Sequence, residues 1–235
     1  MNVLIVGNGQ MGTVVYKELT QRNESVTIVP DLSRPVQGQF DVLIDFSHPD
    51  GLKYIADFAL AQHLPVVIAT TGYSETQLAT ITDLSQNIPV LYSGNYSLGV
   101  ILMERLVREA AAVLGESFDI EIIEKHHHHK IDAPSGTAKM LLHAANEKLN
   151  YDVIYGREGF CKREEKEIAV HTIRGGSIVG EHEVLFAGSD EILSIKHEAL
   201  SKAIFAKGAL KGAQWLINQQ AGLYNMEDVL FKNQI

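Results

Sequence analysis

Short apolar runs alternate with amphipathic stretches over the first part of the chain. The apolar runs are rich in Val and Ile and too short for helices, so they predict buried strands at Val3–Val6, Val26–Val29, Val42–Phe46, Val66–Ala69 and Val90–Tyr92. The stretches between them predict helices near residues 11–22, 50–63 and 75–85. Ser74 and Gln77 form a capping box at the start of the last helix. Strand–helix–strand repeats of this length build a parallel sheet, so we expect a doubly wound α/β domain.

The pattern changes after about residue 98. It predicts a long helix near 98–114, a strand at Asp119–Glu124, a histidine-rich loop and a helix near 136–149. Alternating segments then predict antiparallel strands joined by tight turns at Gly175–Gly176 and Gly188–Asp190: Ile168–Ile173, Ser177–Val179, Glu183–Phe186 and Ile192–His197. A final helix near 200–220, followed by a short tail, is expected to return to the first domain.

These elements predict two domains. Residues 1–97 plus 203–235 form the first, and residues 98–202 form an α+β domain with an open mixed sheet. Because an open, partly apolar sheet often buries one face against another copy, we expect an oligomer.

Composition and charge exclude several classes of protein. The chain has 235 residues with 20 Lys and Arg against 29 Asp and Glu, a net charge of −9 that argues against nucleic-acid binding. With 46% hydrophobic and 21% charged residues it is globular rather than disordered. We find no apolar run long enough to span a membrane and no leader pattern, and the lone Cys161 fits a reducing compartment. We therefore expect a cytoplasmic protein with neither a nucleic-acid nor a membrane partner.

A glycine-rich turn follows the first expected strand and opens the first expected helix. It reads Gly7-Asn8-Gly9-Gln10-Met11-Gly12. In this G-x-G-x-x-G pattern the first glycine permits a tight turn, the second lets a diphosphate approach the backbone and the third permits close helix packing. The helix start adds amide donors and the positive end of a dipole. We expect a dinucleotide site; a glycine turn without a ligand is the alternative.

Polar residues at later strand ends predict the rest of this site. Asp31 lies 19 residues after Gly12, where a carboxylate accepts hydrogen bonds from ribose hydroxyls. Arg34 could bind a 2′-phosphate, so NADH and NADPH both stay open. The segments Ala69-Thr70-Thr71-Gly72 and Ser93-Gly94-Asn95-Tyr96-Ser97 end the next strands. Ligands of open α/β sheets bind outside the carboxyl ends of strands, so we expect both segments to line the crevice; ordinary turns are the alternative.

The stretch from Glu124 to Thr137 is the richest in titratable groups. It contains side chains suited to proton transfer near neutral pH: His126, His127, His128, His129 and Lys130. Pro134 restrains Ala133 to extended backbone. Hydroxyls and backbone amides at the following helix start offer a carboxylate or phosphate site, at Ser135, Gly136 and Thr137.

Two other interpretations of the histidines are a metal site and a solvated loop without chemistry. Consecutive histidines on extended backbone point in alternating directions, and the run has no H-x-x-x-H or H-E-x-x-H spacing. We therefore expect no specific metal.

The pattern E-x-H-H-x-x-K-x-D-A-P-S-G-T from Glu124 to Thr137 resembles the signature of the dihydrodipicolinate reductases, enzymes of diaminopimelate and lysine biosynthesis. The glycine turn and several later segments are also similar to that family and occur in its order: Thr70-Thr71-Gly72, Gly94–Ser97, Ile173–Gly176, Val179–Glu183 and Phe205–Ala209. The resemblance therefore covers nearly the whole chain.

The resemblance implies a Rossmann-type nucleotide domain and a substrate domain whose mixed sheet builds a homotetramer. It implies an NAD(P)H-dependent oxidoreductase that reduces 4-hydroxy-tetrahydrodipicolinate, a cyclic dicarboxylate, to tetrahydrodipicolinate with loss of water. His126 would be the proton donor/acceptor and Lys130 the proton donor. His127 would bind substrate, and Gly136 with Thr137 would bind a carboxylate. The segments Ala69–Thr71 and Ser93–Tyr96 would contact the nicotinamide half of the cofactor.

The sequence departs from the family's common pattern at several positions. Gln10 stands where Arg is frequent, Ala69 where Gly is usual, Tyr96 where Phe is common and Lys202 where Arg is frequent. The first departure weakens any prediction of 2′-phosphate affinity. The segment between the second and third strands is short, and His128 and His129 receive no role.

Two alternative functions use the same crevice. A different Rossmann oxidoreductase, such as an amino-acid dehydrogenase, would leave the His-His-x-x-Lys and Ser-Gly-Thr combination unexplained. A non-enzymatic nucleotide sensor would bind cofactor without turnover, although its expected sign, loss of Lys130 or His126, is absent here.

Overall fold

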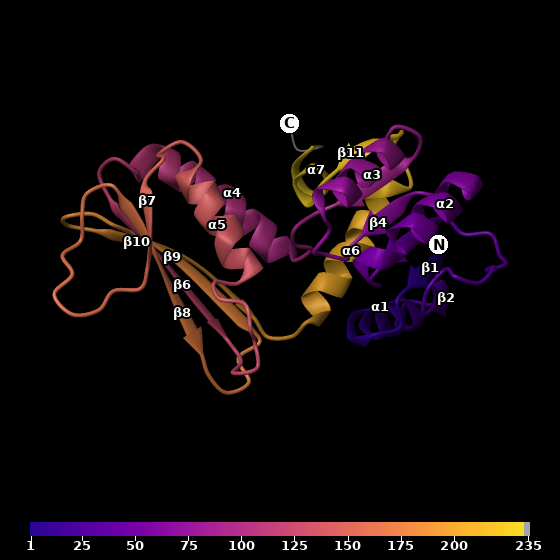
Figure 1. Cartoon of the computed structure of the whole chain (residues 1–235), viewed down its shortest axis with the longest axis horizontal. Helices are drawn as coiled ribbons and strands as arrows, with labels where there is room; N and C mark the ends of the chain where they lie inside the picture. Colours follow the sequence, from indigo (N-terminus) through magenta and orange to yellow (C-terminus); the bar gives the residue numbers. More distant parts are fainter. Residues whose placement is uncertain (233–235) are drawn as a thin grey trace. The chain divides into compact units, whose positions relative to one another are not determined.

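The computed structural model describes residues 1–232, which form two compact units (Figure 1). Of these residues, 1–98 and 202–232 form unit 1, and 99–201 form unit 2. The chain therefore leaves unit 1 once and returns to it at Lys202.

Unit 1 is built on a six-stranded sheet with the order β11-β5-β4-β3-β1-β2, and every pairing in it is parallel. Its strands are β1 (Asn2–Val6), β2 (Ser25–Val29), β3 (Val42–Asp45), β4 (Val66–Ile68), β5 (Pro89–Tyr92) and β11 (Gly222–Tyr224). After β2 the chain crosses to the other side of β1, so the strand order reverses between β1 and β3. In open α/β sheets such a reversal opens a ligand crevice at the carboxyl ends of the two strands.

Helices cover both faces of this sheet. They are α1 (Gln10–Gln21), the 3-10 turn η1 (Pro49–Gly51), α2 (Leu52–Gln62), α3 (Glu75–Ser85), α6 (Ala203–Leu216) and α7 (Met226–Phe231). Apolar side chains of α2 and α3 pack on one face, where Leu4, Leu43 and Val66 are fully buried. Helix α6 packs against α1 and against β3, β4 and β5. Because both faces are covered, the inner strands β1, β3 and β4 consist mostly of buried apolar residues, which is why the short apolar runs identified them.

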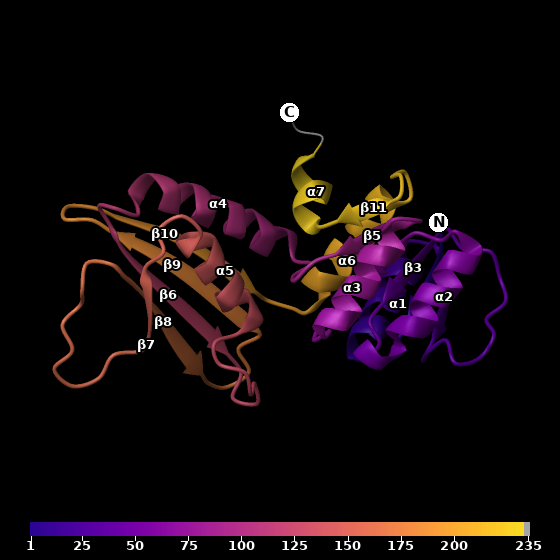
Figure 2. The same ribbon diagram turned by 45° about the horizontal axis from the view of Figure 1, so that its top comes forward.

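Unit 2 is built on a five-stranded mixed sheet with the order β10-β9-β6-β8-β7. Its strands are β6 (Asp119–His126), β7 (Asp152–Tyr155), β8 (Glu167–Arg174), β9 (Gly180–Ala187) and β10 (Ile192–Ala199). Strand β6 pairs with β8 in parallel and with β9 antiparallel. The long helix α4 (Leu98–Leu114) and helix α5 (Gly136–Asn146) both lie on one face of this sheet, as Figures 1 and 2 show. Alternate residues of β6 and β9 face these helices and are buried.

The predicted fold class, a doubly wound parallel sheet plus an α+β unit with an open mixed sheet, is confirmed. Helix α3 has the predicted bounds, and the Ser74–Gln77 capping box is present at its start. Helix α6 and the strands β1 to β5 also lie close to where the sequence indicated.

Several details differ from the sequence prediction. Strands β8 and β9 do not form a hairpin, because β6 lies between them, and Ser177–Val179 belongs to their connection rather than to a strand. Strand β6 continues through His126, so the first histidine is part of the sheet. The prediction also missed three short elements, β7, β11 and α7. Runs of three to six residues carry too little periodicity to be recognised without their neighbours.

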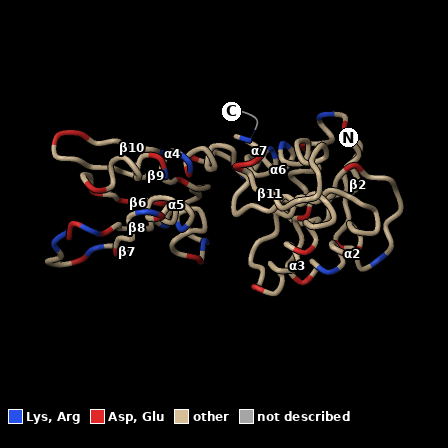
Figure 3. The backbone as a smooth tube through the Cα atoms, turned by 90° about the horizontal axis from the view of Figure 1, so that it is seen from above, with Lys and Arg blue, Asp and Glu red and all other residues tan. Residues whose placement is uncertain are grey.

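Charged residues of both signs are interspersed along the described chain (Figure 3). None of the helices described is long and apolar enough to cross a membrane.

Candidate functional site

The glycine turn after β1 is a cradle made of backbone. Gly7 has φ +101°, and a Cβ on it would lie 2.3 Å from the Phe46 carbonyl oxygen. A Cβ on Gly12 would lie 1.8 Å from the Gly7 oxygen, so neither position tolerates a side chain. A Cβ on Gly9, by contrast, would meet nothing within 4 Å. The middle glycine therefore faces open space, as the approach of a diphosphate requires.

The amides at the start of α1 complete this cradle. Gly9 caps the helix without a side-chain hydrogen bond. The first-turn N–H groups are therefore not occupied by a capping side chain, and such groups bind anions. A glycine turn followed by such a helix start is the kind of backbone site that binds an anionic group.

Lys202 joins this cradle from the far end of the chain. Its Nζ lies 3.2 Å from Oε1 of Gln10, the first residue of α1. From the sequence, Lys202 was only a departure from the Arg that is frequent in the family. Its contact with α1 could not be predicted from the sequence, because Lys202 and Gln10 lie 192 positions apart in the chain.

Asp31 lies in the exposed turn just after β2. Its carboxylate accepts hydrogen bonds from the backbone N–H and hydroxyl of Ser33, and these bonds lower the pKa of Asp31. The group is therefore ionised at neutral pH and suited to accept bonds from hydroxyls.

The segments after β4 and β5 are anchored by buried polar side chains. The Tyr96 hydroxyl lies 2.8 Å from the Ile68 oxygen and 3.1 Å from the Leu91 oxygen, so this side chain links the ends of β4 and β5. Gly208 of α6 packs on the Tyr96 carbonyl, where a Cβ would lie only 1.6 Å away. Tyr96 is 4% exposed, so its side chain is packed inside the unit.

Asp45 is buried at the carboxyl end of β3, next to the strand reversal. Burial raises its pKa, while hydrogen bonds from Ser47 and Tyr73 favour its charged form. Tyr73 follows the Thr70–Gly72 segment, so Asp45 ties that segment to the end of β3. Asp45 was not predicted as a site residue from the sequence.

In unit 2 the candidate acid–base side chains lie around the buried carboxylate of Glu124. It accepts hydrogen bonds from both terminal nitrogens of Arg174, at 2.8 Å each, and from the Ser135 N–H at 2.9 Å. The Nδ1 atom of His126 lies 2.5 Å from Oε2. Burial raises the pKa of Glu124, but the bonds from Arg174, His126 and Ser135 outweigh it and hold the pKa at about 2.

His126 is 8% exposed at the end of β6. Burial lowers its pKa, and the neighbouring Glu124 opposes that shift. Its ring packs edge-on against His182 of β9, with centroids 5.1 Å apart. Burial lowers the pKa of His182 to about 4, so this second imidazole is neutral at pH 7.

The start of α5 is organised by Ser135. Its hydroxyl accepts a hydrogen bond from the Ala138 N–H at 3.1 Å and lies 3.0 Å from Nε2 of His182. With two internal partners and 2% exposure, the hydroxyl acts as a helix cap. The amides of Gly136 and Thr137 lie in the first turn of α5, where a carboxylate binds well. The preceding Ala133–Pro134 peptide bond is cis.

Lys130 lies in the loop between β6 and α5. Its ammonium forms a 2.8 Å ion pair with Asp132, which lowers the pKa of that carboxyl. The Nδ1 of His127 is buried and has no hydrogen-bond partner within residues 1–232. Such an atom is satisfied when a polar ligand binds beside it. Within the same range no three His, Cys, Asp or Glu side chains are grouped so as to hold a metal ion.

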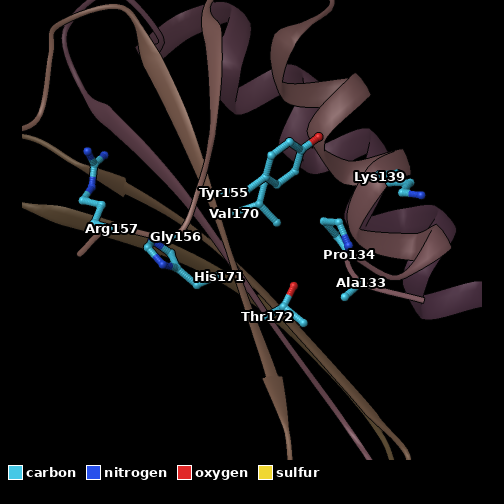
Figure 4. A pocket seen from close by; sticks show the side chains of 9 residues that line it. All are labelled: Ala133, Pro134, Lys139, Tyr155, Gly156, Arg157, Val170, His171 and Thr172. Carbon is cyan, nitrogen blue, oxygen red and sulfur yellow. The ribbon is translucent and has the colours of Figure 1, made fainter. Parts of the chain in front are cut away.

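A pocket of about 640 Å³ lies beside β7 and β8 and extends to Ala133 and Pro134, just before α5 (Figure 4). Lys139 and Arg157 lie at its opposite ends, and their charged groups point away from each other. None of the predicted site residues lines it. Because its polar groups do not converge, we do not assign the chemistry to this pocket.

Glu124, Arg174 and His182 were not predicted as site residues from the sequence. A signal was present, since Glu124 and His126 are polar residues two apart on a strand whose alternate positions are otherwise apolar. Ending the predicted strand at Glu124 hid this pattern. Arg174 and His182 come from β8 and β9, and only the register of the sheet places them beside β6.

Comparison with known proteins gives family matches for both parts of the chain. The family descriptions "Dihydrodipicolinate reductase, N-terminus" and "Dihydrodipicolinate reductase, C-terminus" match residues 1–96 and 99–230. A 4-hydroxy-tetrahydrodipicolinate reductase of Exiguobacterium sibiricum is 50% identical, covering 97% of this chain and 95% of its own. One of Brachyspira hyodysenteriae is 43% identical and covers 98% and 100%.

Among solved structures, a dipicolinate-bound dihydrodipicolinate reductase from Paenisporosarcina sp. TG-14 has a similar fold. Its TM-score is 0.76 at 22% identity, with 96% of this chain and 97% of that chain covered. The chain belongs to the dihydrodipicolinate reductase family.

Proposed function

We propose that this protein reduces 4-hydroxy-tetrahydrodipicolinate to tetrahydrodipicolinate, with NADH or NADPH as the electron donor and loss of water. The observation that carries the proposal is the buried pair of Glu124 and His126 beside Lys130, at the start of a helix that can hold a carboxylate. Family membership selects the substrate among the cyclic dicarboxylates that this arrangement could accept.

The second unit supplies binding and proton transfer. The amides of Gly136 and Thr137 orient a substrate carboxylate, and His127 contributes a polar contact. His126 donates or accepts a proton, and Lys130 donates one to the carbon framework as negative charge builds on the ring. Ser135 contributes by fixing the helix start, since its hydroxyl is already bonded to Ala138 and His182.

The first unit holds the cofactor, which supplies the hydride when bound. The backbone from Gly7 to Gly12 surrounds the diphosphate, with Asn8, Gln10 and Met11 at the helix start. Asp31 binds the adenosine ribose. The nicotinamide half is bound by Ala69, Thr70, Thr71, Ser93, Gly94, Asn95 and Tyr96.

The balance between NADH and NADPH rests on Asp31 and its neighbour Arg34. An ionised Asp31 favours free ribose hydroxyls, whereas Arg34 would pair with a 2′-phosphate. Because both side chains lie in the same exposed turn, we propose that the protein uses both cofactors.

We also propose a homotetramer assembled through the second sheet. Within the described chain, α4 and α5 cover only one face of that sheet. The opposite face exposes Ile173 by 44% and Ile192 by 69%, beside charged side chains. Sedimentation of the purified protein tests the assembly: a monomer at micromolar concentration contradicts it. The exposed free thiol of Cys161 supports a reducing, cytoplasmic location.

A direct assay tests the reaction. Purified protein is mixed with freshly generated 4-hydroxy-tetrahydrodipicolinate, and loss of nicotinamide absorbance is followed with NADH and then with NADPH. We expect oxidation that depends on this substrate. Cofactor binding without oxidation overturns the proposal and favours a nucleotide sensor, and turnover of aspartate or a simple imino acid instead favours an amino-acid dehydrogenase.

A further inference from the structure

We propose that Glu124 is a positioning residue that fixes the tautomer of His126, so that Nδ1 always carries a proton and Nε2 is the nitrogen that exchanges one. The role of His126 in the reaction belongs to the proposed function on which this inference rests. The tautomer and its cause, however, are properties of the protein alone and can be measured without substrate.

Glu124 is held in its ionised form. Its carboxylate is fully buried and accepts two hydrogen bonds from Arg174, one from Ser135 and one at 3.3 Å from the Thr172 hydroxyl. All of these groups are donors, and a carboxyl that receives so many stays ionised. An ionised carboxylate can only accept hydrogen bonds.

The ionised Glu124 determines which nitrogen of His126 carries a proton. Its Nδ1 lies 2.5 Å from Oε2 of Glu124, so this nitrogen must be the donor of the bond. In the neutral ring the proton therefore resides on Nδ1 and the lone pair on Nε2. When the ring is charged, loss of the Nε2 proton returns it to this one neutral tautomer. A carboxylate behind an imidazole has this effect in general, because it holds both ring orientation and tautomer.

Gly180 of β9 lies next to the Nε2 side of the His126 ring. A Cβ at Gly180 of β9 would lie 3.1 Å from Nε2, closer than the ring could tolerate without moving. Gly180 is not among the residues with positive φ, so its backbone does not require a glycine. Glycine at this position therefore avoids a close contact between a side chain and Nε2.

The charged and titratable groups around His126 come from several elements. Glu124 lies on its own strand, Arg174 on β8, His182 on β9 and Lys130 in the following loop. Arg174 and Lys130 disfavour a charged ring, His182 is neutral at pH 7, and Glu124 alone favours the charge. Removing the charge of Glu124 should therefore move the titration of His126 to lower pH.

The decisive measurement uses the unaltered full-length protein. Nitrogen-15 NMR distinguishes a protonated from an unprotonated ring nitrogen, so the shifts of His126 Nδ1 and Nε2 report the tautomer above its titration. We expect a protonated Nδ1 and an unprotonated Nε2. The reverse assignment, or an equal mixture, overturns the proposal, and neither result depends on whether the protein reduces the proposed substrate.

Variants of Glu124 then distinguish a positioning role from a purely structural role of this residue. Glu124→Gln keeps the shape of the side chain but offers an amide donor. We expect loss of the Nδ1 preference, titration at lower pH and at least a tenfold fall in turnover with little change in cofactor affinity. Glu124→Asp retains the charge and should recover part of both the tautomer preference and the turnover. Unchanged ring shifts and turnover in Glu124→Gln contradict the proposal.

The matched control is Glu121→Gln. Glu121 lies on the same strand but faces the other side of the sheet, where it pairs with His171 and Arg157. The Glu121→Gln variant should leave the nitrogen-15 shifts of His126 unchanged. A second variant, Gly180→Ala, places a methyl beside Nε2 and should lower turnover while Nδ1 stays protonated. Full turnover in Gly180→Ala contradicts Nε2 as the exchanging nitrogen.

Discussion

The glycine cradle of unit 1 and the Glu124–His126 cluster of unit 2 are built in opposite ways. The cradle is made of backbone, and its key residues are the ones that lack side chains, within six consecutive positions from Gly7 to Gly12. The cluster is made of buried side chains from β6, β8, β9 and the start of α5. A backbone site depends on local conformation, whereas a side-chain network depends on strand register and helix docking.

This difference predicts how each region responds to change. The cradle should fail when a side chain is added, and its failure should appear in cofactor binding. The cluster should fail when a side chain is removed, and its failure should appear in turnover or in the pH dependence of stability.

The largest effect is expected from Lys130→Ala. Loss of the ammonium removes a proton source and a positive charge from the reacting ring, which should lower turnover by about 10²–10⁴-fold. Cofactor affinity, measured by fluorescence titration, should stay within about twofold because the cradle is unaltered. A near-normal rate would remove Lys130 from the proton-transfer role.

The corresponding change in the cradle is Gly9→Val. A Cβ at this position meets no protein atom, so the fold should tolerate the branched side chain while the diphosphate does not. We expect a loss of about 100-fold in cofactor affinity, equivalent to about 2.7 kcal/mol. Gly9→Ala should give a smaller loss, and both melting temperatures should match that of the unaltered protein. Unchanged affinity in both variants would contradict the diphosphate site.

The cluster should also affect stability in acid. The pKa of His182 is about 4 in the folded protein and 6.5 ordinarily, so between these values the unfolded chain binds more protons. Stability should therefore fall as pH is lowered through this window, by about 2 kcal/mol between pH 7 and pH 5. His182→Gln should make this slope shallower in urea unfolding. The control His143→Gln, at an exposed position of α5, should retain it. An equal slope in both variants would assign the effect to other groups.

The smallest effect is expected from Lys202→Met. Because this side chain lies exposed beside Gln10, its charge should add roughly 0.5–1 kcal/mol to diphosphate binding. We expect the cofactor KM to rise about two- to fivefold at low salt, with the difference shrinking at high salt. Lys211→Met, which removes a charge elsewhere on α6, serves as the control. Equal effects from both lysines would indicate general charge attraction rather than a local contact.

The sequence by itself determined the parallel sheet, the glycine cradle and the stretch from Glu124 to Thr137. Each is a local feature: buried strands consist of continuous apolar residues, the turn needs glycines at fixed spacing, and a helix start follows Ser135. Capping signals even fixed the bounds of α3.

Only the tertiary structure decided which strands are neighbours. The sequence indicated a hairpin across Gly175–Gly176, yet β6 lies between β8 and β9. That insertion places Arg174 and His182 on either side of Glu124 and His126, and so creates the cluster. Strand order is set by the packing of whole elements against α4 and α5, which no short segment of sequence encodes. For the same reason the contact between Lys202 and Gln10 could not be predicted from the sequence alone.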